Sequence, residues 1–229
     1  MRVLAIDTAL GQCGACVLEG DDPAPLAAES IRMERGHAEA LLPLLDRVMS
    51  RTEGGFSRLD LVVVTIGPGS FTGLRIGIAA ARAVGLAVPC PVVGVSTLSA
   101  LMAPLLDAEP PPPGIVVAAI DARGGRVYAQ AIGASGRIII PPSVLTLREV
   151  VRALGSGPVT AVGSAAAAVV TEALSVGLDA RVHPAPPDPE LLWVARLGAA
   201  ADPDEAVPRP LYLASPDARP QDGYRLPRQ

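Results

Sequence analysis

The chain has no lysine and no asparagine, so all 19 of its basic residues are arginines. A Walker phosphate loop ends in Gly-Lys, and the absence of lysine therefore excludes it. Only two histidines are present, His37 and His183, and neither has an obvious partner for a catalytic triad or a zinc site. For His37, at the start of a predicted helix, we expect a capping role and a contact facing solvent or a partner.

Aromatic residues make up 3% of the chain and hydrophobic residues 50%, so the core must be built from Ala, Val, Leu and Ile. A length of 229 residues fits one large domain or two small ones. The net charge of −4 argues against strong independent binding to nucleic acid, which depends on neutralising phosphates. No charge-free run of about 18 apolar residues occurs, which predicts no membrane span. Asp7 interrupts the apolar N-terminal segment, so we expect no signal peptide and a cytoplasmic protein.

Cysteine is also scarce, with three residues in the chain. Cys13 and Cys16 form a CxxC pattern inside a predicted strand, where residues three apart point to opposite faces. We therefore expect buried or half-buried thiols rather than a redox or metal motif. Cys90 lies between two prolines and has no visible partner.

The centre of the sequence is a strand, a turn and a helix. Residues 61–66 form a continuous apolar run that predicts a buried strand, and Gly67-Pro68-Gly69 predicts a turn. A helix capped by Ser70 or Thr72 should then extend to about residue 85. Its small residues recur every fourth position, at Gly69, Gly73, Gly77, Ala81 and Gly85. Glycine costs about 0.5–1 kcal/mol in a helix interior, so this ridge predicts a very close neighbour.

The turn does not match two other ligand-binding or catalytic loops. A dinucleotide GxGxxG loop would need glycine where Thr72 stands. A GxSxG nucleophile elbow around Ser70 would need glycine at Pro68 and at Thr72.

The order of predicted elements repeats. In each half, three strands precede a helix, a strand, a helix, a strand and a helix, which gives βββαβαβα twice. The predicted first-half elements are strands 3–7, 11–18, 26–33, 61–66 and 92–95, and helices 36–49, 70–85 and 96–106. The predicted second-half elements are strands 117–122, 126–132, 137–140, 159–162 and 180–183, and helices 147–154, 165–176 and 190–200. Four consecutive prolines within residues 109–114 mark the boundary.

This duplication predicts an α/β chain of two lobes, residues 1–108 and 109–200, with an extended tail at 201–229. The last helix of the second lobe can pack back on the first. The pattern resembles the two-lobed fold of actin, hexokinase and Hsp70. In that fold Asp7 and Asp121, which end the first strand of each half, would face a nucleotide cleft. The alternative is that each caps the turn that follows it, and the sequence leaves both open.

Residues 67–77, Gly-Pro-Gly-Ser-Phe-Thr-Gly-Leu-Arg-Ile-Gly, resemble the signature of the TsaB family, also called YeaZ. The resemblance extends from Met1 to residues 210–213, Pro-Leu-Tyr-Leu. It implies a non-catalytic scaffold and activator in the synthesis of threonylcarbamoyladenosine, the modified adenosine beside the tRNA anticodon. The sister family TsaD would carry the catalysis, with two metal-binding histidines where this chain has Thr97 and Leu101. Neither residue can replace an imidazole ligand.

The resemblance also implies partners and a surface for them. We expect a TsaD-like catalytic subunit, a TsaE-like ATPase, a homodimer when the chain is alone, tRNA only through the complex, and no cofactor. The contact should use helices 36–49 and 71–85. The expected contact residues are His37, Leu41, Leu45, Gly69, Gly73, Leu74, Gly77, Ile78, Ala81 and Arg82. The alternative is an enzyme, either an actin-fold ATPase or kinase using Asp7 and Asp121, or a glycoprotease-like protein.

Overall fold

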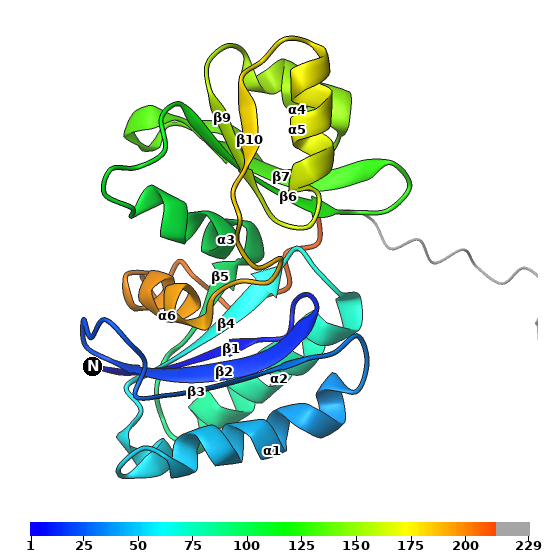
Figure 1. Ribbon diagram of the computed structural model, residues 1–229. Helices are drawn as coiled ribbons and strands as arrows, with labels where there is room; N and C mark the ends of the chain where they lie inside the picture. The colour runs from blue at the N-terminus through cyan, green and yellow to red at the C-terminus, as the bar shows by residue number, and fades with distance from the viewer. Residues whose placement is uncertain (214–229) are drawn as a thin grey trace, which may run out of the picture.

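The computed structural model describes residues 1–213, which form two lobes placed one above the other (Figure 1). The strands of the first lobe are β1 (Arg2–Asp7), β2 (Gln12–Glu19), β3 (Ala27–Arg32), β4 (Leu61–Gly67) and β5 (Val92–Ser96). Those of the second lobe are β6 (Ile115–Asp121), β7 (Arg126–Ile132), β8 (Ile138–Thr146), β9 (Val159–Val162) and β10 (Ala180–Val182). The helices are α1 (His37–Ser50), α2 (Phe71–Ala87), α3 (Thr97–Leu106), α4 (Leu147–Leu154), α5 (Ala166–Ser175) and α6 (Leu191–Ala199).

Each lobe is built on a five-stranded mixed sheet, and the two sheets have the same topology. The first sheet has the order β3-β2-β1-β4-β5 and the second the order β10-β9-β6-β7-β8. In both, the first strand of the half pairs antiparallel with the second and parallel with the fourth. The predicted duplication of βββαβαβα is therefore confirmed in the arrangement of strands as well as in their order.

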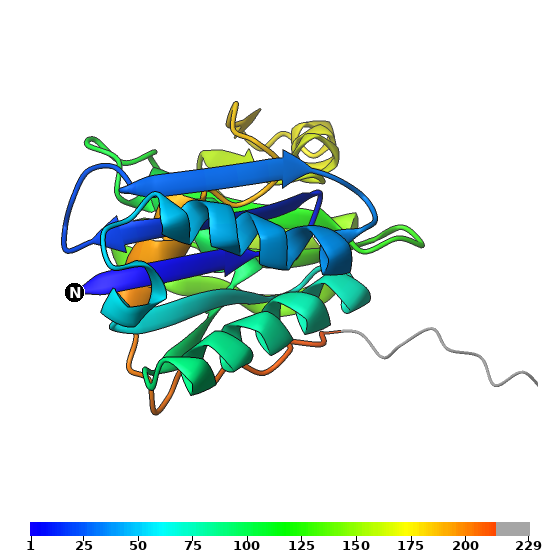
Figure 2. The ribbon, with the colours of Figure 1, turned by 90° about the horizontal axis from the view of Figure 1, so that it is seen from below.

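Helices cover the sheets in layers. α1 and α2 lie side by side on one face of the first sheet (Figure 2), and α6 packs on the opposite face against β1, β2 and β4. In the second lobe, α4 and α5 pack on the face turned away from the first lobe. α3 lies between the lobes and contacts both β6 and α6. The layer of α3 and α6 therefore joins the two halves of the chain.

Most predicted elements end within two or three residues of the observed ones. The main difference is β8, which was expected over residues 137–140 and continues to Thr146 through Pro141 and Pro142. Proline is tolerated there because β8 is the edge strand of its sheet and has a neighbour on one side only. Ser70 is the observed cap of α2, and its side chain accepts a hydrogen bond from the amide of Gly73.

The cysteines follow the alternation of the strand. Cys13 lies in the core between the first sheet and α1, and Cys16 in the core under α6. Cys13 and Cys16 are buried, as predicted, Cys90 is half-buried, and all three cysteines are free. Burial raises the pKa of Cys13 to about 11 and that of Cys16 to about 12. The thiol form is therefore favoured at both positions.

After α6 the chain returns over the first lobe as a strap, residues 206–213. The carbonyl of Ala206 accepts a hydrogen bond from the amide of Gly94 on β5, and the amide of Leu211 donates to Ile66 on β4. The rest of the tail, 214–229, lies outside the described residues. Among the helices of residues 1–213, none has the length and apolar character needed to cross a membrane.

Candidate functional site

The glycine ridge of α2 faces the chain's own first sheet. A side chain at Gly69 would collide with the carbonyl oxygen of Ala9, and one at Gly73 with that of Thr8. At Gly77 the obstacle is the hydroxyl of Thr8, which donates a 2.8 Å hydrogen bond to the Gly73 carbonyl. The predicted close neighbour is therefore the end of β1 and the loop after it.

Most of the expected contact residues are buried in the first lobe. The buried side chains are Leu41, Leu45, Leu74, Ile78 and Ala81, together with Gly73 and Gly77. Leu41, Leu45, Ile78 and Ala81 belong to the core that α1 and α2 share with the sheet. These side chains are not available to a partner in this conformation. The proposal that α1 and α2 form an interface must therefore use their other faces.

His37 differs from its expected role. Gly36 is the cap residue of α1, with φ +91°, and no side chain caps this helix. The His37 side chain is 6% exposed, and its Nε2 atom has no hydrogen-bond partner among the described residues. His37 therefore neither caps α1 nor faces solvent. Sequence reasoning could not detect this, because the first position of a helix can point inward or outward.

The outer face of α1 and α2 carries small and apolar residues. Leu42 on α1 is 62% exposed, and Leu86 on α2 is 85% exposed. Ala79, Ala83 and Ala87 form an exposed stripe on α2, four residues apart. We define these five exposed residues as the outer helix face. The sequence contained this signal, since each alanine follows a ridge position by two residues, more than half a turn around the helix.

The strap is fastened to the flank of α2. Arg82, an expected contact residue, is exposed but donates a 2.7 Å hydrogen bond to the carbonyl of Pro208. At the start of α2, Phe71 stacks on Tyr212 with ring centroids 5.4 Å apart. The Arg75 guanidinium lies 3.7 Å from the centroid of Phe71, and its Nε donates to the Tyr212 hydroxyl at 3.1 Å. Sequence reasoning missed this cluster, because nothing in a proline-rich tail indicates which helix it crosses.

An open cleft of about 990 Å³ lies between the lobes. It is lined by the loop after β1, the loop after β3, the first turn of α2, the β6–β7 turn and the segment before α6. Asp121 lies on its wall, and one of its carboxylate oxygens accepts a hydrogen bond from the amide of Arg123. Asp121 therefore both caps the turn that follows it and lines the cleft, so the two predicted positions for this residue are compatible.

Asp7, the counterpart of Asp121, is sealed beneath the cleft. Its carboxylate accepts hydrogen bonds from Thr65 Oγ1 at 2.6 Å, Gln12 Nε2 at 2.8 Å and the amide of Ala9 at 3.1 Å. Its side chain is fully buried, and this loss of solvation raises its pKa above 3.8 despite those hydrogen bonds. The two aspartates are thus equivalent in sequence and topology but not in environment, since only Asp121 reaches the cleft.

The buried position of Asp7 predicts a pH-dependent contribution to stability. Below about pH 3.8, Asp7 is protonated in both the folded and the unfolded state, so its ionisation does not lower the free energy of unfolding. As the pH rises through the folded-state pKa, the contribution of protonated Asp7 to the free energy of unfolding is lost, because Asp7 releases its proton at a lower pH in the unfolded chain. The free energy of unfolding of the wild type minus that of Asp7→Asn should therefore decrease with pH. Urea unfolding at several pH values measures this, with Asp121→Asn as the exposed control. A difference that increases with pH would show that the carboxylate is favoured in the fold.

Thr97 and Leu101 lie in the layer between the lobes. Both are buried on α3, and Leu101 packs in a core with Ile120 and Val162 of the second lobe. The hydroxyl of Thr97 has no hydrogen-bond partner among residues 1–213. Within the same residues, no group of three or more His, Cys, Asp or Glu side chains is arranged to hold a metal ion.

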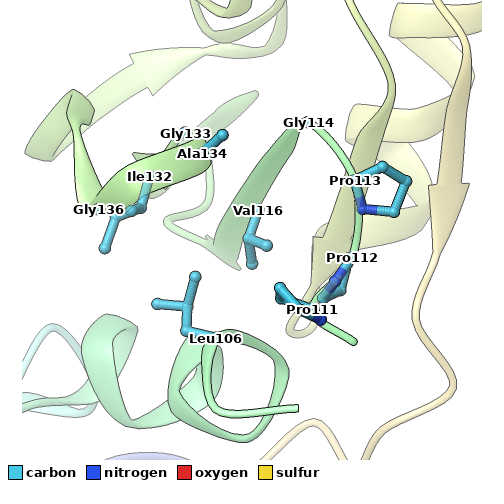
Figure 3. Close-up of a pocket in the computed structure, with 10 residues that line it drawn as sticks. All are labelled: Leu106, Pro111, Pro112, Pro113, Gly114, Val116, Ile132, Gly133, Ala134 and Gly136. Carbon is cyan, nitrogen blue, oxygen red and sulfur yellow. The ribbon is translucent and has the colours of Figure 1, made fainter. Parts of the chain in front are cut away.

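A second hollow, of about 510 Å³, lies beside the proline-rich linker (Figure 3). Its lining comes from the end of α3, the linker, β6 and the β7–β8 turn, namely Leu106, Pro111, Pro112, Pro113, Gly114, Val116, Ile132, Gly133, Ala134 and Gly136. Every one of these residues is apolar, so the hollow offers no side chain for acid–base or metal chemistry.

Known proteins share both the sequence and the fold. A model of the family described as TsaD, tRNA N6-adenosine threonylcarbamoyltransferase, matches residues 31–182. An uncharacterized protein of Mycobacterium tuberculosis is 35% identical over 218 residues, which cover 95% of this chain and 94% of that protein. The tRNA threonylcarbamoyladenosine biosynthesis protein TsaB of Escherichia coli is 34% identical over 128 residues, 56% of this chain and 53% of that protein.

Among solved structures, YeaZ from Pseudomonas aeruginosa superposes with a TM-score of 0.70 at 24% identity, and the match covers 93% of this chain and 99% of that one. The predicted duplicated α/β fold of two lobes is thereby confirmed. The similarity to proteins named TsaB agrees with the resemblance carried by residues 67–77. With the match over residues 31–182, the chain belongs to the TsaD family of tRNA N6-adenosine threonylcarbamoyltransferase proteins and is similar to those of its relatives that are named TsaB.

Proposed function

We propose that the chain is a non-catalytic subunit in the synthesis of tRNA threonylcarbamoyladenosine. In this role it binds and orients a TsaD-like catalytic subunit through the outer helix face. It works in the cytoplasm, with a TsaE-like ATPase as the third member of the complex. When the partner is absent, the same face pairs two copies of this chain.

The observation that carries the proposal is the burial of Thr97 and Leu101. By resemblance, the catalytic TsaD-like subunit would have metal-binding histidines at these positions. Here Leu101 fills the core between the lobes, and the Thr97 hydroxyl is enclosed in the same layer. A metal bound at this place would need ligands and an open coordination position. The packed core offers neither at these two residues.

The outer helix face supports the choice of surface. Leu42 and Leu86 are large apolar side chains that a single chain leaves in water. The alanine stripe on α2 allows the backbone of another helix to approach closely. Large apolar side chains exposed on the same helical layer are candidates for protein–protein contacts. The glycine ridge holds α2 against the sheet and so fixes the orientation of this face.

The competing ATPase or kinase reading receives less support. It needs Asp7 and Asp121 together at a nucleotide and its metal. Asp7 is occupied by three hydrogen bonds beneath the cleft, so only Asp121 is free to face a ligand.

Co-purification tests the proposed function. A tagged full-length chain should retain the TsaD-like protein of the same cell, and the complex, with its TsaE-like ATPase, should form threonylcarbamoyladenosine on tRNA when a threonylcarbamoyl adenylate and ATP are supplied. The chain alone should form none. Product formation by the isolated chain, or the absence of any TsaD-like protein from the purified complex, would contradict the proposal.

A further inference from the structure

The interlobe cleft contains two arginines that have no partner on opposite walls. Arg35 comes from the loop after β3 in the first lobe and Arg123 from the β6–β7 turn in the second. Within residues 1–213, neither guanidinium group has an ion pair or a side-chain hydrogen bond, and both residues are exposed. Two guanidinium groups on opposite walls of a cleft are suited to phosphate oxygens.

Two of the three carboxylates that line the cleft accept a hydrogen bond from a backbone amide. Asp188 accepts a 2.7 Å hydrogen bond from the amide of Gly11 and lies 3.9 Å from the guanidinium of Arg32. Asp121 accepts from the amide of Arg123. The third, Glu34, is exposed at the rim. The lining holds three arginines as well as these three carboxylates, and two of the arginines, Arg35 and Arg123, form no ion pair within residues 1–213.

Exposed aromatic rings stand at the same opening. Phe71 lines the cleft, and Tyr212 stacks against it; they are 44% and 45% exposed. Tyr128, which is half-buried, lines the same cleft, so three of the chain's six aromatic residues lie in or beside it. Aromatic rings beside arginines form platforms for unpaired bases.

We infer that the cleft binds unpaired nucleotides of RNA, with Arg35 and Arg123 on phosphates and the exposed ring of Tyr212, which is stacked on Phe71, under a base. A magnesium nucleotide fits less well, because the chain has no lysine for a phosphate loop and Asp7 is sealed beneath the cleft. The inference rests on the proposed function, in which the RNA is the tRNA that the catalytic partner modifies. It adds a direct RNA contact that depends on the complex, in keeping with the net charge of −4.

Fluorescence anisotropy of a labelled hairpin RNA with an unpaired loop tests this, on the full-length chain bound to its TsaD-like partner. Arg35→Ala with Arg123→Ala should weaken binding and reduce the slope of log K against log salt by about 1.4, about 0.7 for each phosphate contact to a single strand. Tyr212→Ala should weaken binding about tenfold, whereas Tyr212→Phe, which keeps the ring, should not. Arg152→Ala, exposed on α4 in the second lobe, is the matched control.

The outcomes separate the two proposals. If the partner is not captured, the proposed function fails before RNA is added. If the partner is captured but the double variant binds the hairpin with wild-type affinity and salt slope, the cleft inference is overturned and the proposed function stands. Equal affinity for the fully paired duplex of the same stem, or displacement of the hairpin by micromolar magnesium ATP, would also overturn it. A loss confined to the arginine pair and Tyr212→Ala supports it.

Discussion

Gly73→Ala is expected to lower the free energy of unfolding by roughly 1–3 kcal/mol, because the new methyl group enters a space already filled by backbone atoms. The obstacle is the carbonyl oxygen of Thr8, at the end of β1, which cannot rotate away as a side chain could. Alanine favours the helix by about 1 kcal/mol over glycine, so any loss of stability must come from this collision. For a chain of this length the loss corresponds to a decrease in Tm of about 2–12 °C. Thermal and urea unfolding measure it.

Ala79→Gly provides the control for this prediction. Ala79 is exposed on the same helix, so its replacement should cost only helix propensity, up to about 1 kcal/mol. Gly77→Leu should be more damaging than either, because it displaces Thr8 from its hydrogen bond with Gly73. If Gly73→Ala were as stable as the wild type, α2 would not pack on β1 as closely as the structure indicates.

Ala83→Arg is expected to abolish or strongly weaken the contact with the TsaD-like partner while the chain stays folded. Arginine has nearly the helix propensity of alanine, and position 83 is open to solvent in the single chain. In a complex that covers the outer helix face, a long charged side chain would prevent close approach. We expect the dissociation constant to rise by more than tenfold, or about 1.4 kcal/mol. Calorimetry or a quantitative pull-down measures this change.

Ala168→Arg is the matched control for the interface prediction, because Ala168 is exposed on α5 in the second lobe. Circular dichroism should show both variants folded. Light scattering should show that Ala83→Arg also prevents pairing of two copies. Wild-type capture of the partner by Ala83→Arg would place the interface elsewhere on the chain.

The fold was largely predictable because its determinants are local. The duplicated pattern was identified from three local features: the periodicity of strands and helices, the proline-rich boundary, and the repeat of Ile-Asp at the end of β1 and β6. The family was predictable from residues 67–77, since an eleven-residue motif is specific. The full length of β8 was not, because two prolines normally argue against a strand unless its edge position is known.

The site was less predictable because it depends on which surfaces meet. A helix with glycine every fourth position indicates a close neighbour but not whose backbone it is, and for Gly69 and Gly73 the neighbour is the loop after β1 of the same chain. Asp7 and Asp121 occupy matching positions, yet the first is surrounded by Thr65 and Gln12, and the second meets only its own turn. Such differences arise from tertiary packing, which the local sequence does not encode.

The packing of α6 on the first sheet has a consequence for synthesis on the ribosome. β5 completes the first sheet at Ser96, but the helix that covers one of its apolar faces begins only at Leu191. At translation rates of about 5–20 residues per second, that face stays exposed for roughly 5–20 s before α6 has been synthesised. The nascent first lobe therefore exposes Val3, Ala5 and Val63 to the surroundings during this interval. Protection by a chaperone would matter most in that window, and a chain shortened before α6 would keep the same apolar surface permanently exposed.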